Sequence, residues 1–199
     1  MKTALITGAT SGIGEACARR FARGGYHLIL TGRNEAKLEE LRTLSLKEVN
    51  PDIDVRTLVF DVRDREATTA AIKSLWDISP TGKFQDKGVD ILINNAGLAL
   101  GLEKEYEGDY DDWDTMIDTN IKGLLTMTRL VVPEMVKQGY GHVINIGSVA
   151  GGQRCGENGY AHRSRNQQAF FLAQEIHEKH PLKNFSCLNP HKNLPFRVI

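Results

Sequence analysis

The sequence predicts a doubly wound α/β domain built on a parallel sheet. Short apolar runs rich in β-branched residues alternate with longer amphipathic runs, which is typical of βαβ units. The short runs are almost continuously apolar, as strands are when helices cover both faces of their sheet. Because crossovers between parallel strands are right-handed, successive helices are expected on both sides of one sheet.

The expected elements follow this alternation along the chain. Strands are predicted at residues 3–7, 27–31, 55–60, 89–94 and 142–147, and NFSCL (184–188) also fits a short strand. Helices are predicted at about 12–23, 34–47, 64–76 and 111–138. The helical pattern is clearest in EAKLEELRTL, where leucines recur at intervals of three with charged residues between them.

Length and composition indicate one globular domain. A chain of 199 residues, 41% hydrophobic and 25% charged, is long enough for one sizeable core and short for two. The 25 basic and 25 acidic residues balance, so charge gives no reason to expect nucleic acid or an anionic membrane as a partner. No run reaches the roughly 18 apolar residues of a membrane span, and the N-terminal run is too short for a signal peptide. A cytoplasmic location is therefore expected.

Neither a disulfide framework nor a metal site is expected. Cys17, Cys155 and Cys187 are odd in number and form no CxxC pair, which fits reduced thiols. The acidic cluster at 109–114 lies at a predicted helix start, where carboxylates commonly cap the helix and complement its dipole.

A glycine-rich turn joins the first predicted strand to the first predicted helix. In ITGATSGIGEA, Gly8, Gly12 and Gly14 have the spacing TGxxxGxG. Glycine permits a tight turn and lets backbone N–H groups approach a pyrophosphate, whose charge the helix N-terminus favours. A purely structural βα turn would also use glycine, so both interpretations stay open on this motif alone. A triphosphate-binding P-loop is not expected, because the turn lacks the Gly-Lys-Ser/Thr ending.

The end of the second predicted strand indicates which dinucleotide would bind. An NAD site usually places an acidic residue there, about 20 residues after the glycines, to bind the ribose hydroxyl. This chain has Thr31-Gly32-Arg33 instead. Arg33 could hold the 2′-phosphate of NADP, although a solvated arginine is also ordinary at a helix start. NADP is therefore favoured over NAD.

Four further motifs follow in order. Asp61-Val62 ends the third predicted strand, and NNAG (94–97) ends the fourth. Asn120 lies in DTNIKG on the long predicted helix, and Ser148 lies in INIGSVAG after the fifth strand. Together with TGATSGIG, these motifs make residues 1–151 resemble the short-chain dehydrogenase/reductase family. NNAGLALG and WDTMIDTNIKGLL look similar to its NADP-dependent 3-hydroxy acid (serine-type) dehydrogenase subgroup.

The resemblance implies a Rossmann-type fold and hydride transfer between NADP and a small alcohol, a 3-hydroxy acid or its carbonyl form. The cofactor-binding residues that it implies are Gly8, Thr10, Ser11, Gly12, Ile13, Gly14, Arg33, Asp61, Val62, Asn94, Ala96 and Gly97. In the family a serine bonds the carbonyl, a tyrosine transfers the proton and an asparagine anchors a water. The matching residues are Ser148, Tyr160 and Asn120. A homo-oligomer packed through the long helix at 111–138 and a second helix that begins at about residue 159 is also implied.

The chain departs from the family pattern after Gly151. Residues 152–199 are divergent, although we expect the whole chain, 1–199, to form a single dinucleotide-binding domain. Ser164 stands where the family has a lysine that holds the ribose and lowers the pKa of the tyrosine. Arg163 could supply charge, but its planar guanidinium is no substitute for an ammonium on the ribose. The family's substrate loop and last strand are expected to be missing.

Three hypotheses remain open: a weakened enzyme, a non-catalytic NADP-binding protein, and a truncated inactive family member. A free tyrosine has a pKa near 10, so it works poorly near neutral pH unless a cation lowers that pKa. Without the lysine we expect turnover to be weaker by about 10²-fold or more.

Overall fold

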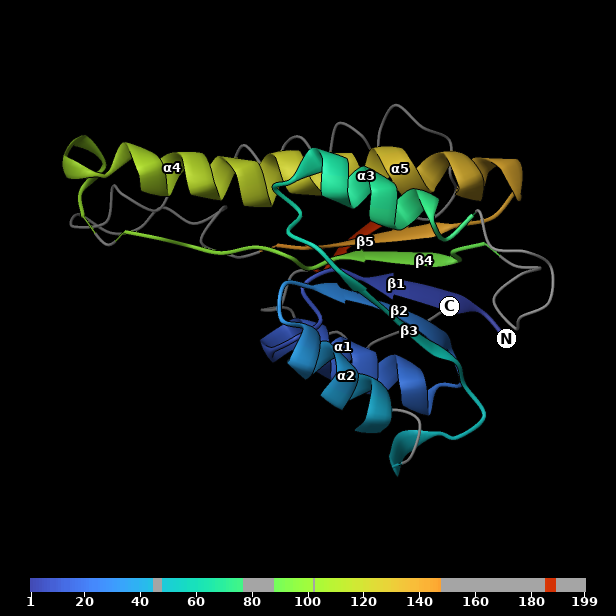
Figure 1. Cartoon of the computed structure of the whole chain (residues 1–199). Helices are drawn as coiled ribbons and strands as arrows, with labels where there is room; N and C mark the ends of the chain where they lie inside the picture. Colours follow the sequence, from blue (N-terminus) through green and yellow to red (C-terminus); the bar gives the residue numbers. More distant parts are fainter. Residues whose placement is uncertain (45–47, 77–87, 102, 148–184, 189–199) are drawn as a thin grey trace.

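A six-stranded parallel sheet forms the centre of the protein (Figure 1). The structure is a computed structural model that describes residues 1–44, 48–76, 88–101, 103–147 and 185–188. The strands are β1 (Thr3–Ile6), β2 (His27–Gly32), β3 (Val55–Val59), β4 (Ile91–Asn94), β5 (His142–Ile146) and β6 (Phe185–Leu188). Their order is β3-β2-β1-β4-β5-β6, and every neighbouring pair is parallel. The short strand predicted at 184–188 is therefore confirmed as β6.

Helices cover both faces of the sheet. α1 (Gly12–Arg23) and α2 (Glu35–Leu44) lie on one side, and α3 (Arg65–Lys73), α4 (Tyr110–Ile117) and α5 (Leu124–Lys137) lie on the other (Figure 1). This arrangement confirms the predicted doubly wound, Rossmann-type α/β fold. None of the helices in the described part of the chain combines the length and the apolar character needed to cross a membrane.

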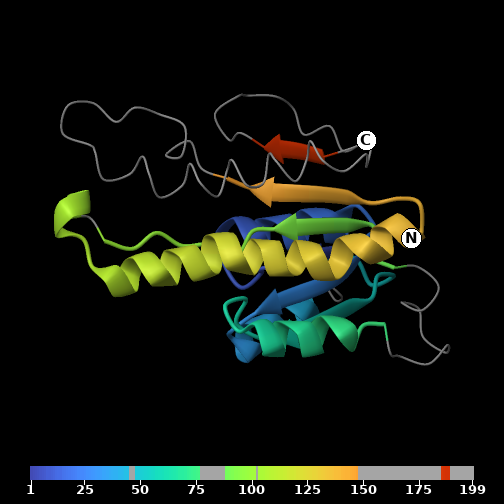
Figure 2. The same cartoon turned by 90° about the horizontal axis from the view of Figure 1, so that it is seen from above.

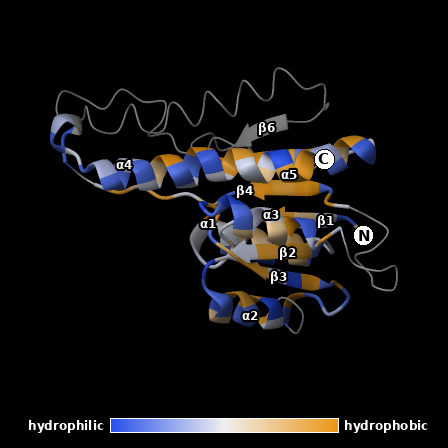
Figure 3. Cartoon of the chain, turned by 45° about the horizontal axis from the view of Figure 1, so that its top comes forward, coloured by the Kyte–Doolittle hydropathy of each residue, from blue (hydrophilic) through white to orange (hydrophobic). Residues whose placement is uncertain are grey.

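Side chains along the central strands alternate between two hydrophobic cores. Ile6 and Leu30 pack in the core with α1 and α2, whereas Leu5, Ile29 and Leu92 pack in the core with α3 and α5. Figure 3 shows hydrophobic residues concentrated along the strands. Burying one such side chain contributes roughly 1.5–3 kcal/mol. The need to fill both cores explains why the strands read as nearly unbroken apolar runs.

The single helix predicted at 111–138 is divided into three segments. The π-helix η3 (Asp118–Gly123) separates α4 from α5, and Figure 2 shows these segments following one line across the sheet. A π-turn takes up one extra residue and is frequent at functional sites. The apolar periodicity of the sequence does not reveal this insertion, because the segments before and after it are both ordinary helix.

The strand order reverses between β1 and β4. β1 pairs with β2 on one side and with β4 on the other, so the chain winds outward from β1 in both directions. In open parallel sheets, ligands bind in the crevice outside the carboxyl ends of the strands at such a reversal. The predicted cofactor residues follow β1, β2, β3 and β4, and the fold therefore brings them to this edge.

Candidate functional site

The turn from β1 into α1 depends on glycine for two reasons. Gly8 and Gly12 have φ angles of 63° and 55°, which residues with a Cβ rarely adopt. Gly14 is required by close approach, because a Cβ there would collide with the carbonyl oxygen of Gly8 and lie 2.5 Å from Asn95 Nδ2. The first turn of α1 therefore packs directly against the glycine turn.

The N-terminus of α1 is open to an anion. Ser11, which precedes the helix, makes no capping hydrogen bond with its side chain. First-turn N–H groups have no acceptor within their own helix, and the helix dipole favours negative charge beside them. Ser11 and Gly12 are exposed, and Ile13 is 56% exposed. This end of α1 has the exposure and polarity that a phosphate group requires.

Thr10 fixes the glycine turn against the end of β2. A Cβ on Gly32 would lie 2.8 Å from Thr10 Cγ2, so the threonine methyl group fills the space that glycine leaves. The Ala9 N–H also donates to the Thr31 carbonyl oxygen at 3.0 Å. Arg33 directly follows Gly32, and these contacts therefore hold its backbone beside the turn.

Asn95 connects the end of β4 to the glycine turn. Its Nδ2 donates to the carbonyl oxygens of Thr7 at 2.9 Å and Gly8 at 3.0 Å. In return, the Thr7 hydroxyl oxygen accepts from the backbone N–H groups of Asn95 and Ala96, both at 2.9 Å. These four bonds join segments nearly 90 residues apart and position Ala96 beside the glycine turn.

The Asn94 side chain faces the side of the sheet that α5 covers. Its side chain is buried, and its Nδ2 donates to Thr128 Oγ1 at 3.2 Å and to Asn145 Oδ1 at 2.9 Å. Its side chain thus links β4 to α5 and β5 and does not join the glycine turn.

Asn120 binds the backbone that follows β4. Its Oδ1 accepts from the Leu98 N–H at 2.9 Å, and its Nδ2 donates to the Leu98 carbonyl oxygen at 2.7 Å. Gly97 leaves room for this pairing, since a Cβ there would lie 3.2 Å from Asn120 Oδ1. Within the described part of the chain these are its two bonds, so the amide has one further donor and one further acceptor position with which to hold a water.

Val62 packs against the π-helix. A Cβ on Gly123 would lie 2.9 Å from Val62 Cγ2 and 3.3 Å from the Val62 carbonyl oxygen. Gly123 therefore lets the segment after β3 approach η3 closely. With Asn120 on the β4 side, this contact holds η3 between the segments that follow β3 and β4.

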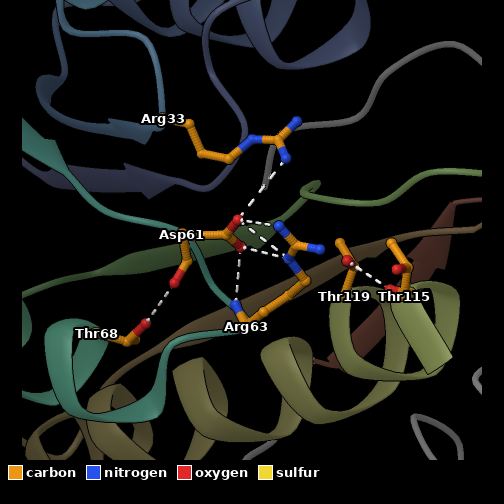
Figure 4. A network of polar contacts seen from close by, with 6 residues as sticks. All are labelled: Arg33, Asp61, Arg63, Thr68, Thr115 and Thr119. Atoms are coloured by element: carbon orange, nitrogen blue, oxygen red, sulfur yellow. Dashed lines mark hydrogen bonds and ion pairs between the residues drawn. The ribbon is translucent and has the colours of Figure 1, made fainter. Parts of the chain in front are cut away.

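Asp61 lies between two arginines at the end of β3. Arg63 holds its carboxylate with three side-chain contacts of 2.8–3.1 Å, and Arg33 Nη1 lies 3.7 Å from Asp61 Oδ2 (Figure 4). Burial by itself would raise the pKa of Asp61. The hydrogen bonds from Arg63 and the charges of both arginines outweigh burial, so the pKa of Asp61 is lowered. Asp61 is therefore ionised at neutral pH.

The predicted catalytic residues are only partly placed. Asn120 is described, whereas Ser148, Tyr160, Arg163 and Ser164 lie outside the described residues.

The acidic cluster at the start of α4 has a capping role. The Asp109 side chain accepts from the Asp111 N–H at 2.7 Å. Across the described ranges, no group of three or more His, Cys, Asp or Glu residues is arranged to hold a metal ion.

A profile of the short chain dehydrogenase family matches residues 2–161. The chain belongs to this family. In the structure, the glycine turn, Asp61-Val62 and the segment that begins at Asn94 lie at the carboxyl ends of β1, β3 and β4.

Individual relatives support the same assignment. The NADP-dependent 3-hydroxy acid dehydrogenase YdfG of Salmonella typhi is 48% identical over 147 residues, which are 74% of this chain and 54% of that protein. Sulfoacetaldehyde reductase 2 of Chromohalobacter salexigens is 47% identical over 148 residues, again 74% of this chain and 54% of the relative. The crystal structure of serine dehydrogenase from Escherichia coli superposes with a TM-score of 0.75 at 36% identity, covering 94% of this chain and 79% of that one. The chain spans about half the length of the curated relatives it matches.

The sequence motifs do not identify two residues that hold the site together. Thr7 and Asn95 form the connection between β1 and β4, yet neither was among the predicted cofactor residues. The signal available was the second asparagine of NNAG, whose partners lie 87–88 residues away.

Proposed function

We propose that the chain binds NADP as a single dinucleotide-binding domain and acts as an oxidoreductase on a small alcohol, a 3-hydroxy acid or its carbonyl form. The observation that carries this proposal is the assembly at the carboxyl edge of the sheet. There the exposed N-terminus of α1, the exposed Arg33 and the ionised Asp61 follow β1, β2 and β3. The NADP-dependent activity in the name of the 48% identical relative supports the choice of cofactor.

The residues at this edge fit a dinucleotide phosphate. The α1 N–H groups can bind the pyrophosphate, because Gly14 keeps the helix start close to the turn. Arg33 can bind the 2′-phosphate, since its side chain is 66% exposed and no acidic residue occupies the ribose position. Asp61-Val62 would contact the adenine, and Ala96-Gly97 would line the ribose side of the crevice. When bound, the nicotinamide supplies the hydride chemistry.

The proton would be handled by Tyr160, with Ser148 bonding the substrate oxygen and Asn120 holding a water. Asn120 is suited to this role because its pairing with Leu98 fixes its amide while leaving one donor and one acceptor position. Ser164 cannot supply the positive charge that lowers the pKa of a tyrosine. We therefore propose that turnover is weak.

A second candidate is a protein that binds NADP without turnover. Ser164 favours it, because the lysine position is altered while the glycine turn is intact. The substrate stays open within the proposed class, because a 3-hydroxy acid dehydrogenase and a sulfoacetaldehyde reductase match this chain almost equally well. A homo-oligomer and a cytoplasmic location complete the proposal, and the free thiol of Cys17 is consistent with the latter.

A titration followed by a turnover assay tests this proposal. Saturable quenching or enhancement of NADPH fluorescence by the full chain, with a raised melting temperature, is expected in either case. Oxidation of a panel of 3-hydroxy acids would then identify an enzyme, and binding without turnover would identify the second candidate. Absence of saturable NADPH binding would overturn both.

A further inference from the structure

Arg63 contacts the same carboxylate as Arg33 but in a different manner. Arg63 Nε lies 3.0–3.1 Å from both carboxylate oxygens of Asp61, and Arg63 Nη2 lies 2.8 Å from Oδ2. The Arg63 backbone N–H adds a fourth bond of 3.0 Å to Oδ1. Arg33 reaches Oδ2 only at 3.7 Å. Figure 4 shows the two guanidinium groups approaching Asp61 from different directions.

This arrangement determines which arginine remains available. A fork-shaped contact to a carboxylate is among the strongest side-chain pairings, whereas a contact at 3.7 Å on an exposed side chain is weak. Asp61 is thus paired mainly with Arg63, and its contact with Arg33 is weak, the one ion pair that Arg33 makes within the described residues. Without the charge of Arg63, Asp61 would attract Arg33 more strongly and would repel a phosphate placed beside it.

The fold does not need the Arg63 side chain to position Asp61. The Asp61 carbonyl oxygen accepts from Thr68 Oγ1 at 3.2 Å (Figure 4). It also accepts from the Asp64 N–H at 3.0 Å. Asp64 in turn caps α3 by accepting from the Ala67 N–H at 2.9 Å. These bonds hold the β3–α3 connection without the guanidinium of Arg63.

We propose that Arg63 is a positioning residue that favours NADP over NAD, because it neutralises Asp61 and thereby leaves Arg33 free to bind the 2′-phosphate. The inference rests on the proposed function and deepens it. NAD lacks the 2′-phosphate, so its affinity depends far less on whether Arg33 is free.

Replacing Arg63 tests this inference. In Arg63→Met, one uncompensated carboxylate near the phosphate should weaken NADPH binding on the order of tenfold, while NADH binding changes by less than about threefold. Arg65→Met is the matched control, since Arg65 is exposed at the start of α3, and it should change neither affinity. Arg63→Lys keeps the charge and should recover most of the preference for NADPH. Melting temperatures of all variants check that folding is intact.

Repeating the Arg63 substitution in an Asp61→Asn variant shows whether Arg63 acts through Asp61 or binds the phosphate directly. Asp61→Asn removes the competing charge, so adding Arg63→Met to it should no longer alter the NADPH-to-NADH affinity ratio. An unchanged ratio in Arg63→Met alone would overturn the inference. So would the same loss in the Asp61→Asn background, because Arg63 would then bind the phosphate itself. Failure of the proposed function is distinguishable, since the unaltered chain would bind neither NADPH nor NADH, and the inference would fall with it.

Discussion

Two substitutions test how the Asn95 side chain connects β4 to the glycine turn. One removes its hydrogen bonds, and the other replaces its N–H donor with an acceptor. Asn95→Ala removes two side-chain hydrogen bonds to the carbonyl oxygens of Thr7 and Gly8. At about 1 kcal/mol for each bond, the free energy of unfolding should fall by about 2 kcal/mol. For a domain of this size that loss lowers the melting temperature by about 4–8 °C. NADPH affinity should fall as well, because the glycine turn loses the side-chain hydrogen bonds that connect it to the end of β4.

Asn95→Asp keeps the size of the side chain but replaces the N–H donor with an acceptor. A carboxylate facing two carbonyl oxygens should cost about 3 kcal/mol or more, which exceeds the effect of alanine. Partial burial and the facing oxygens would raise the pKa of the new carboxyl above its unfolded value. The folded state would then bind more protons, so the deficit should shrink as the pH is lowered.

Thermal and urea unfolding at several pH values measure these effects. Asn50→Ala is the control, because it also removes two side-chain hydrogen bonds, one of 3.3 Å to the Ala22 carbonyl oxygen and one of 3.0 Å from the exposed Asp52 N–H, but away from the cofactor residues. Its destabilisation should be smaller than that of Asn95→Ala, because water can replace the exposed bond, and NADPH affinity should not change. A melting temperature of Asn95→Ala close to that of the parent, or an Asn95→Asp variant more stable than the alanine variant at neutral pH, would show that these hydrogen bonds do not stabilise the glycine turn.

Three further predictions follow from the site. Gly14→Ala should abolish saturable NADPH binding, because the added Cβ collides with the glycine turn. Gly25→Ala is the control: its backbone φ of 76° is strained for alanine, but it lies away from the cofactor residues, so it should lower stability and leave NADPH affinity unchanged. Ser164→Lys should raise NADPH-linked turnover by about 10²-fold, and no gain in a folded, cofactor-binding variant would show that the lysine position does not limit activity. The pKa of Asp61 is lowered in the folded state, so its pairing with Arg63 stabilises the protein at pH values above the unfolded pKa near 3.9. This contribution is lost as the pH falls through the folded pKa. Unfolding measured against pH should therefore show a shallower acid limb in Asp61→Asn than in the parent.

The sequence predicted the fold because the signals involved are local and repeated. Each central strand must place side chains in two cores, so its apolar run is recognisable without knowledge of its neighbours. The glycine turn could also be predicted from the sequence, because the positive φ angles of Gly8 and Gly12 are local properties of the backbone.

Contacts between distant segments could not be predicted in the same way. The division of helix 111–138 by η3 is accompanied by the pairing of Asn120 with Leu98, 22 residues earlier, and no periodicity reports such a bond. The burial of Asn94 toward α5 was missed for the same reason. The competition of Arg33 and Arg63 for Asp61 arises only when β2 and β3 are placed side by side.

Binding of a dinucleotide at the carboxyl edge of the sheet can be tested by following residue-resolved amide resonances during an NADPH titration. The largest shifts are expected at residues 8–14, Arg33, 61–63 and 94–98, and NADH should perturb Arg33 less than NADPH does. Shifts confined to the opposite edge, where Lys2 Nζ donates to the Tyr140 hydroxyl, or no saturable shift at all, would contradict binding at this edge.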